Sequence, residues 1–160
     1  MFQYFWQIVN MFTTLLFLSC SLLAVYARTP EEVKTWFMQQ GMLCNNEHPI
    51  TPEQMVMLQR HKIPESENVK CLLACVYKKA QWLTNSGTFD VDKAKDLAKE
   101  EFANDATKLE NANKLFDECK SVNDKPAADG AAGCDRSFLI SHCLIENSPK
   151  FGFDLQHVHL

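Results

Sequence analysis

The sequence lacks the short motifs of common hydrolytic and metal-dependent active sites. It contains no G-x-S-x-G, no H-E-x-x-H and no Asp-rich calcium loop. A hydrolase would also need a nucleophile or a metal beside a base, and His48, His61 and His142 are isolated along the chain. The H-V-H of residues 157–159 offers two metal ligands without a third nearby. We therefore predict no catalysis, no metal and no cofactor; turnover of lipid or ester substrates would indicate the alternative.

Concentrated positive charge is also missing. The net charge is −4 and both signs are mixed along the chain, so there is no basic surface of the kind that binds nucleic acid. Alternating apolar and polar runs, internal repeats and low-complexity tracts are absent as well. The missing alternation argues against β-strands.

The first 27 residues contain no Asp, Glu, Lys or Arg. Their apolar stretch, MFTTLLFLSCSLLAVYA, ends in small residues, and Val25 and Ala27 occupy positions where signal peptidase requires small side chains. A membrane anchor is the alternative, since the stretch is long enough to span a bilayer. The polar sequence that begins at Arg28 favours removal. We predict a signal peptide at 1–27 and a secreted, extracellular domain at 28–160, in which no segment is apolar enough to cross a membrane.

Helix start signals recur along residues 28–160. Thr29-Pro-Glu-Glu and Thr51-Pro-Glu-Gln each combine an N-cap threonine, a proline at the first helical position and an acid or amide three residues after the cap. Asp90, Asp105 or Thr107, and Asp135 are further candidate caps. Gly41 and Pro64 are expected to end the first two helices. The sequence predicts an all-α domain of about six short helices, at 30–40, 53–62, 66–83, 91–103, 108–122 and 136–147, with a turn at 84–87 and a loop at 123–133.

Six cysteines follow residue 28, and an even number in a secreted chain predicts three disulfides. Cys71 and Cys75 lie four residues apart on one helix, where their parallel Cβ vectors are poorly placed to bond to each other. Excluding that bond leaves twelve of the fifteen pairings that six cysteines allow. The two thiols are therefore expected to attach this helix to two other parts of the chain.

The spacing of these cysteines, C-x26-C-x3-C-x43-C-x14-C-x8-C, resembles that of the insect odorant-binding protein family, which includes the pheromone-binding proteins. The x3 and x8 intervals carry most of the resemblance, and the chain length and helix order agree with it. The resemblance implies helices around an apolar cavity and three interlocked disulfides, Cys44–Cys75, Cys71–Cys134 and Cys119–Cys143.

In that family the cavity holds a small apolar ligand. Large apolar side chains on the expected inner faces and in the tail are the candidate ligand-binding residues here, with ordinary core packing as the alternative for each: Phe37, Leu73, Val76, Tyr77, Trp82, Leu83, Phe116, Ile140, Leu144, Phe151 and Phe153. Tyr77 and Trp82 could also donate a hydrogen bond to a ligand oxygen. The tail after Pro149 resembles family tails that fold back as a cavity wall; a frayed terminus is the alternative.

The predicted function is a secreted carrier of small odorant-like or pheromone-like molecules, such as an alcohol, aldehyde, ester or terpenoid. Such a carrier would deliver its ligand through aqueous lymph to a membrane odorant receptor, acting as a monomer or weak homodimer. Binding driven by apolar burial predicts micromolar affinity and loose selectivity. The alternative is a secreted helical effector or signalling protein that acts on a protein partner; it should have a filled core and an exposed apolar patch.

Overall fold

The computed structural model describes residues 29–153; the predicted signal peptide and residues 154–160 lie outside this range. The described chain is helical and contains no β-strand beyond an isolated bridge between Leu83 and Phe89. This confirms the all-α prediction. The elements are α2 (Pro30–Asn45), α3 (Pro52–Gln59), α4 (Glu67–Lys79), α5 (Val91–Glu101), α6 (Ala106–Cys119), η1 (Lys120–Asp124), η2 (Gly130–Ala132), α7 (Cys134–Asn147) and η3 (Ser148–Phe151).

The N-termini of α2 and α3 are fixed by the capping boxes that the sequence predicts. The backbone N–H of Glu32 donates to Thr29 Oγ1 at 3.2 Å, and the N–H of Thr29 donates to Glu32 Oε2 at 2.7 Å. Thr51 and Gln54 repeat the arrangement at 3.2 and 2.9 Å. Each box satisfies two backbone donors that the helix leaves unpaired, so these starts are determined locally.

The first helix does not stop at Gly41 as predicted. Helix α2 continues to Asn45, so Cys44 lies inside the helix and not in a loop after it. Gly41 keeps helical geometry, and a glycine inside a helix costs only about 1 kcal/mol relative to alanine. The disulfide from Cys44 to Cys75 on α4 attaches this last turn to the rest of the protein and favours the longer helix.

Helices α3 and α4 end three or four residues earlier than predicted, and neither ends at a glycine or proline. His61 and Gln81 adopt left-handed backbone conformations, with φ of 57° and 61°. The next residue in each case closes the helix, since Lys62 N–H donates to Met57 O at 2.9 Å and Trp82 N–H to Tyr77 O at 2.8 Å. Helix α5 likewise ends at Glu101, two residues before the predicted end.

The start of α7 also differs from the prediction. Its N-cap is Gly133, with φ of 75°, and Asp135 lies inside the first turn. The Asp135 carboxylate instead accepts hydrogen bonds from Lys70 Nζ at 3.1 Å and from Ala128 N–H at 3.2 Å. The expected loop at 123–133 includes the end of η1 and all of η2.

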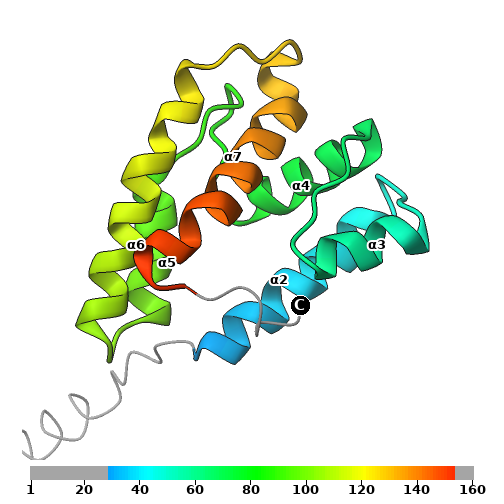
Figure 1. The fold of residues 1–160 in the computed structure, drawn as a ribbon. Helices are drawn as coiled ribbons and strands as arrows, with labels where there is room; N and C mark the ends of the chain where they lie inside the picture. Colours follow the sequence, from blue (N-terminus) through cyan, green and yellow to red (C-terminus); the bar gives the residue numbers. More distant parts are fainter. Residues whose placement is uncertain (1–28, 154–160) are drawn as a thin grey trace, which may run out of the picture.

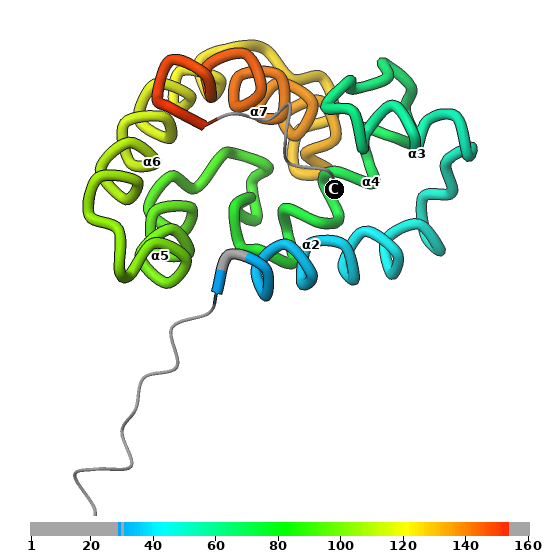
Figure 2. Tube along the Cα trace, turned by 60° about the horizontal axis from the view of Figure 1, so that its bottom comes forward, coloured from blue at the N-terminus to red at the C-terminus, as the bar shows by residue number. Residues whose placement is uncertain are grey.

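Helices α4 and α7 form the middle of the molecule and make its most extensive interhelical contact. Figures 1 and 2 show α5 and α6 side by side at one end, α3 at the opposite end and α2 along one edge. The larger hydrophobic cluster is formed by α4, α5, α6, α7 and the segment 82–89, and a smaller one lies between α2 and α4.

Three disulfides connect these helices, in the pairing implied by the family resemblance. Cys44–Cys75 joins α2 to α4, Cys71–Cys134 joins α4 to the start of α7, and Cys119–Cys143 joins the end of α6 to α7. Helix α4 is therefore covalently attached on one side to α2 and on the other to α7, which is the role expected for its two cysteines.

Candidate ligand-binding site

Trp82 is the centre of an aromatic cluster in the core. Its ring centroid lies 5.4 Å from that of Tyr77, which stacks on it, and 5.6 and 5.5 Å from Phe37 and Phe116, which meet it edge to face. Phe89 lies 6.3 Å away. These rings come from α2, α4, α6 and the segment after α4, so residues far apart in the sequence form one apolar cluster.

The end of α4 places the indole in this cluster. The left-handed conformation of Gln81 reverses the chain after the last helical turn, and the hydrogen bond from Trp82 N–H to Tyr77 O holds the new direction. Asp90 N–H then donates to Trp82 O at 2.7 Å, which closes the segment 82–90 on itself. The turn predicted at 84–87 is present within it, closed by the bond from Gly87 N–H to Thr84 O at 3.0 Å.

Asn123 fixes the far side of this segment. Its Oδ1 accepts from Phe89 N–H at 2.8 Å, and its Nδ2 donates to Phe89 O at 3.0 Å. Both backbone groups of Phe89 are thus satisfied by a single side chain from η1. This two-point attachment directs the Phe89 ring toward Trp82 and Phe116.

The two polar groups in the cluster, the Tyr77 hydroxyl and the Trp82 indole N–H, differ in their hydrogen bonding. Tyr77 Oη is hydrogen-bonded to Ser141 Oγ on α7 at 2.8 Å, and burial raises the pKa of Tyr77 to about 12, so the phenol stays neutral in the physiological range. Trp82 Nε1 is buried and has no hydrogen-bond partner within the described part of the chain. Of the two donors predicted for a ligand oxygen, only the indole N–H is uncommitted.

Most of the predicted ligand-binding residues meet in this core. Five are buried in the main cluster: Tyr77, Trp82, Leu83, Phe116 and Ile140. Four are half-buried and pack against it: Phe37, Leu144, Phe151 and Phe153. Val76 instead belongs to the smaller cluster with Cys44 and Leu72, which Phe37 also contacts. Leu73 is half-buried and belongs to neither cluster of described residues.

Three further residues of this core are not among the predicted ligand-binding residues: Phe89, Ser141 and Phe102. Phe89 and Ser141 contact Trp82 and Tyr77, and Phe102 lies 5.9 Å from the ring of Phe153. An aromatic residue directly before the cap at Asp90 was an available signal for Phe89. No local pattern marks Ser141, which depends on the pairing of α4 with α7.

The start of the tail folds onto the core. Ser148 Oγ donates to Leu144 O at 2.5 Å, and Phe153 N–H donates to Ser148 O at 3.0 Å across Gly152, whose φ is 77°. This turn reverses the chain and brings the ring of Phe153 beside that of Phe102. The remainder of the tail lies outside the described residues.

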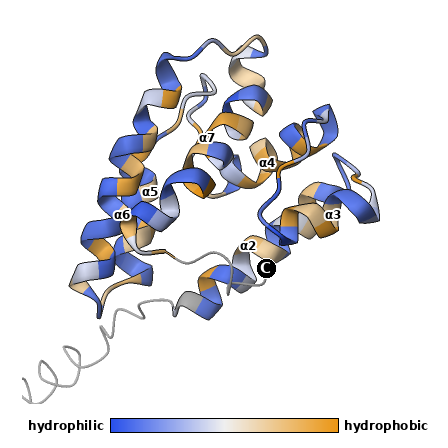
Figure 3. Cartoon of the chain, in the orientation of Figure 1, coloured by the Kyte–Doolittle hydropathy of each residue, from blue (hydrophilic) through white to orange (hydrophobic). Residues whose placement is uncertain are grey.

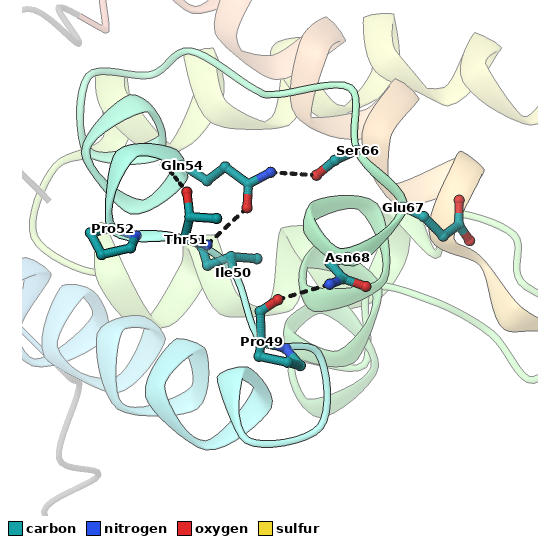
Figure 4. A pocket seen from close by; sticks show the side chains of 8 residues that line it. All are labelled: Pro49, Ile50, Thr51, Pro52, Gln54, Ser66, Glu67 and Asn68. Atoms are coloured by element: carbon teal, nitrogen blue, oxygen red, sulfur yellow. Dashed lines mark hydrogen bonds between the residues drawn. The ribbon is translucent and has the colours of Figure 1, made fainter.

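A separate groove of about 510 Å³ lies between the segment before α3 and the start of α4 (Figure 4). It is open to solvent, and hydrogen bonds from Gln54 Nε2 to Ser66 Oγ and from Asn68 Nδ2 to Pro49 O join its two sides. None of the predicted ligand-binding residues lines it; its residues are Pro49, Ile50, Thr51, Pro52, Gln54, Ser66, Glu67 and Asn68.

One cluster of potential metal ligands occurs among the described residues. Glu67, Cys71 and Cys134 place a ligand atom each within 4.8 Å of one another. Both sulfurs form a disulfide, however, and metal coordination by cysteine requires thiolates. The arrangement does not fit a metal site in the oxidised protein.

Fold and site together define a small, disulfide-linked helical protein with an aromatic interior. Residues 26–147 match the PBP/GOBP family, and the chain belongs to that family. Its proteins are carriers and not enzymes, so membership confirms that the chain is not an enzyme. Family and fold support a carrier role and the binding of small hydrophobic ligands. None of the described helices has the length and apolar character needed to cross a membrane.

Curated relatives agree with this assignment. General odorant-binding protein 19d of Drosophila melanogaster is 30% identical over 113 residues, which cover 71% of this chain and 72% of the relative. The B1 protein of Tenebrio molitor is 22% identical over 134 residues, covering 84% of this chain and 94% of the relative.

Two solved structures share the fold. The odorant-binding protein dmelOBP28a of Drosophila melanogaster superposes with a TM-score of 0.64 at 23% identity, covering 78% of this chain and 98% of that one. Odorant Binding Protein 4 of Chrysopa pallens gives a TM-score of 0.61 at 17% identity, with coverage of 79% and 98%.

Proposed function

We propose that the protein is a secreted carrier that encloses one small, mostly apolar molecule around Trp82 and delivers it through extracellular fluid to a membrane receptor. The observation that carries this proposal is the convergence of predicted ligand-binding residues from four helices and the tail on one aromatic cluster. Burial of ligand surface against these rings provides the driving force, at about 25 cal/mol per Å² before the costs of association.

Titration of the oxidised protein with N-phenyl-1-naphthylamine, an apolar fluorophore, tests this function. We expect saturable one-site binding, with displacement by medium-chain alcohols, aldehydes, esters and terpenoids at micromolar concentrations. Failure of the folded protein to take up the fluorophore would contradict the proposal.

A pair of variants tests the location of the site. Phe116→Leu alters a ring in contact with Trp82, whereas Met42→Ala alters a side chain on α2 that is 63% exposed. We expect the first to weaken displacement by a medium-chain ester at least about fivefold, roughly 1 kcal/mol, because one ring contact is lost. The second should leave it unchanged. Equal effects would place the site elsewhere.

Exposed apolar side chains favour the effector function as a second candidate. Figure 3 shows apolar positions on both α2 and α3. The large apolar side chains that are exposed among the described residues lie on these two helices: Met38, Met42, Leu43, Val56 and Met57. Exposed apolar patches are typical of protein interaction sites, and these side chains are candidates for one. The fluorophore titration separates the two functions, because an effector with a filled core would show no saturable uptake.

A further inference from the structure

The core contains a strong hydrogen-bond donor without an acceptor. The Trp82 side chain is buried, with the residue 9% exposed, and its Nε1–H has no hydrogen-bond partner among residues 29–153. A buried indole N–H usually finds a partner, because leaving it unpaired in an apolar interior forfeits the hydrogen bond that it made to water. An orphaned donor of this kind in a native core therefore calls for a specific explanation.

The described side chains around the indole do not supply an acceptor. Phe37, Phe89 and Phe116 present only ring carbon and hydrogen to the indole. The one oxygen among the neighbouring rings, Tyr77 Oη, is held by Ser141 Oγ at 2.8 Å. An N–H···π contact to an edge-to-face ring is the remaining possibility within the protein, and such contacts are weak.

We propose that Trp82 Nε1 is the recognition donor of the binding site and that the preferred ligand is an apolar molecule bearing a carbonyl oxygen: an aldehyde, a ketone or an ester. This inference rests on the proposed carrier function and narrows its ligand class. A carbonyl brings acceptor lone pairs and no donor of its own, so it satisfies the indole without adding another unpaired group. A hydrocarbon of the same shape leaves the indole unpaired.

The inference predicts discrimination between two ligands of matched shape. Undecan-2-one and 2-methylundec-1-ene differ only in the replacement of C=O by C=CH₂. Competition against the fluorophore gives the dissociation constant of each for wild type and for Trp82→Phe, which keeps an aromatic ring and removes the N–H. We expect the substitution to weaken ketone binding about tenfold, as for the loss of one buried hydrogen bond, and to change alkene binding less than about twofold.

Trp36→Phe is the matched control. Trp36 is the other tryptophan among the described residues; it lies on α2, is half-buried, and its ring centroid is 5.1 Å from that of Phe37. The Trp36→Phe substitution should leave the ratio of the ketone and alkene dissociation constants unchanged.

A measurement on the wild-type protein keeps the test independent of how the variant folds. In ¹⁵N-labelled protein, the indole Nε1–H resonance of Trp82 should move downfield with saturating ketone and not with the alkene, because only the ketone accepts a hydrogen bond. Equal weakening of both ligands by Trp82→Phe, or no ketone-specific shift, would overturn the proposal and leave the carrier function intact. Absence of binding by either ligand to folded wild type would instead remove the carrier function itself.

Discussion

Removal of each disulfide in turn should destabilise the protein to different extents, in an order set by the loop that each one closes. The bridges span sequence separations of 63, 31 and 24 residues. By loop-closure entropy they contribute about 4.3, 3.7 and 3.4 kcal/mol, respectively. The corresponding double alanine variants are Cys71→Ala with Cys134→Ala, Cys44→Ala with Cys75→Ala, and Cys119→Ala with Cys143→Ala.

The three double substitutions should lose similar packing in the folded state. Differences in their free energy of unfolding therefore report the entropy of loop closure in the unfolded chain. Each disulfide joins one buried cysteine to one half-buried cysteine: Cys44 to Cys75, Cys134 to Cys71, and Cys119 to Cys143. The packing lost on truncation to alanine is therefore similar in the three variants. The difference expected between the largest loop and the other two is about 0.6–0.9 kcal/mol.

Urea denaturation followed by circular dichroism measures this difference directly. The variant without Cys71–Cys134 should have the lowest free energy of unfolding. Its melting temperature should lie about 2–4 °C below those of the other two, given the size of the domain. Equal midpoints for all three variants, or the lowest stability for the shortest loop, would refute the loop-closure reasoning.

Two glycines should respond to alanine in opposite directions, as urea denaturation can show. Gly41→Ala should stabilise by about 0.5–1 kcal/mol, because Gly41 is helical and nothing lies within 4 Å of the position that a Cβ would occupy; no gain would contradict this. Gly87→Ala should destabilise by more than about 2 kcal/mol, since φ is 77° and the Cβ would lie 2.1 Å from Gly130 O. The Lys70–Asp135 ion pair, at 3.1 Å, lowers the pKa of Asp135 and raises that of Lys70. The contribution of the ion pair to the free energy of unfolding should therefore be present from about pH 5 to 10. It should disappear as acid protonates the carboxylate or as base neutralises the amine. Asp135→Asn should cost at most about 1 kcal/mol across that range and nothing below about pH 2; a deficit that persists there would refute an ionic origin.

The starts of most helices could be predicted from sequence because they depend on local hydrogen bonds. Thr29, Thr51, Asp90 and Asp105 each accept a backbone N–H three residues later, as their sequence context indicates. Two starts differ. Ser66 precedes α4 without a side-chain cap bond and accepts from Gln54 Nε2, and the Asp135 carboxylate accepts from Lys70 on another helix and from the N–H of Ala128.

Helix ends were less predictable because they depend on tertiary contacts. Gly41 looked like a stop, yet the disulfide at Cys44 favours continuation of the helix. His61 and Gln81 stop helices at positive φ; histidine is enriched in that conformation, whereas glutamine is not. For Gln81 the reversal is accompanied by burial of Trp82, so the packing of the indole, and not the local sequence, accounts for the end of α4.

The aromatic cluster proposed as the binding site follows the same rule: residues fixed by local sequence were predictable, and residues placed by tertiary contacts were not. Cysteine spacing and family resemblance were sufficient to predict that Phe37, Tyr77 and Phe116 face the interior, because these residues keep a fixed position relative to a cysteine on the same helix. Phe89 and Ser141 could not be found in this way. The first is fixed by Asn123, which lies 34 residues away in sequence, and the second by the contact between α4 and α7.

Two of the three disulfides lie on the helix faces that carry the candidate site. Phe37 precedes Cys44 by seven residues on α2, and Ser141 follows Cys134 by seven residues on α7. Because seven residues are about two turns of an α-helix, each pair lies on one face, so attaching the cysteine to α4 also turns the other side chain toward α4. Phe37 then meets Trp82, and Ser141 meets the phenol of Tyr77. The two cysteines of α4 thus fix the orientation of α2 and α7 about their helix axes, as well as stabilising the domain. This orientation brings the aromatic side chains together around the indole.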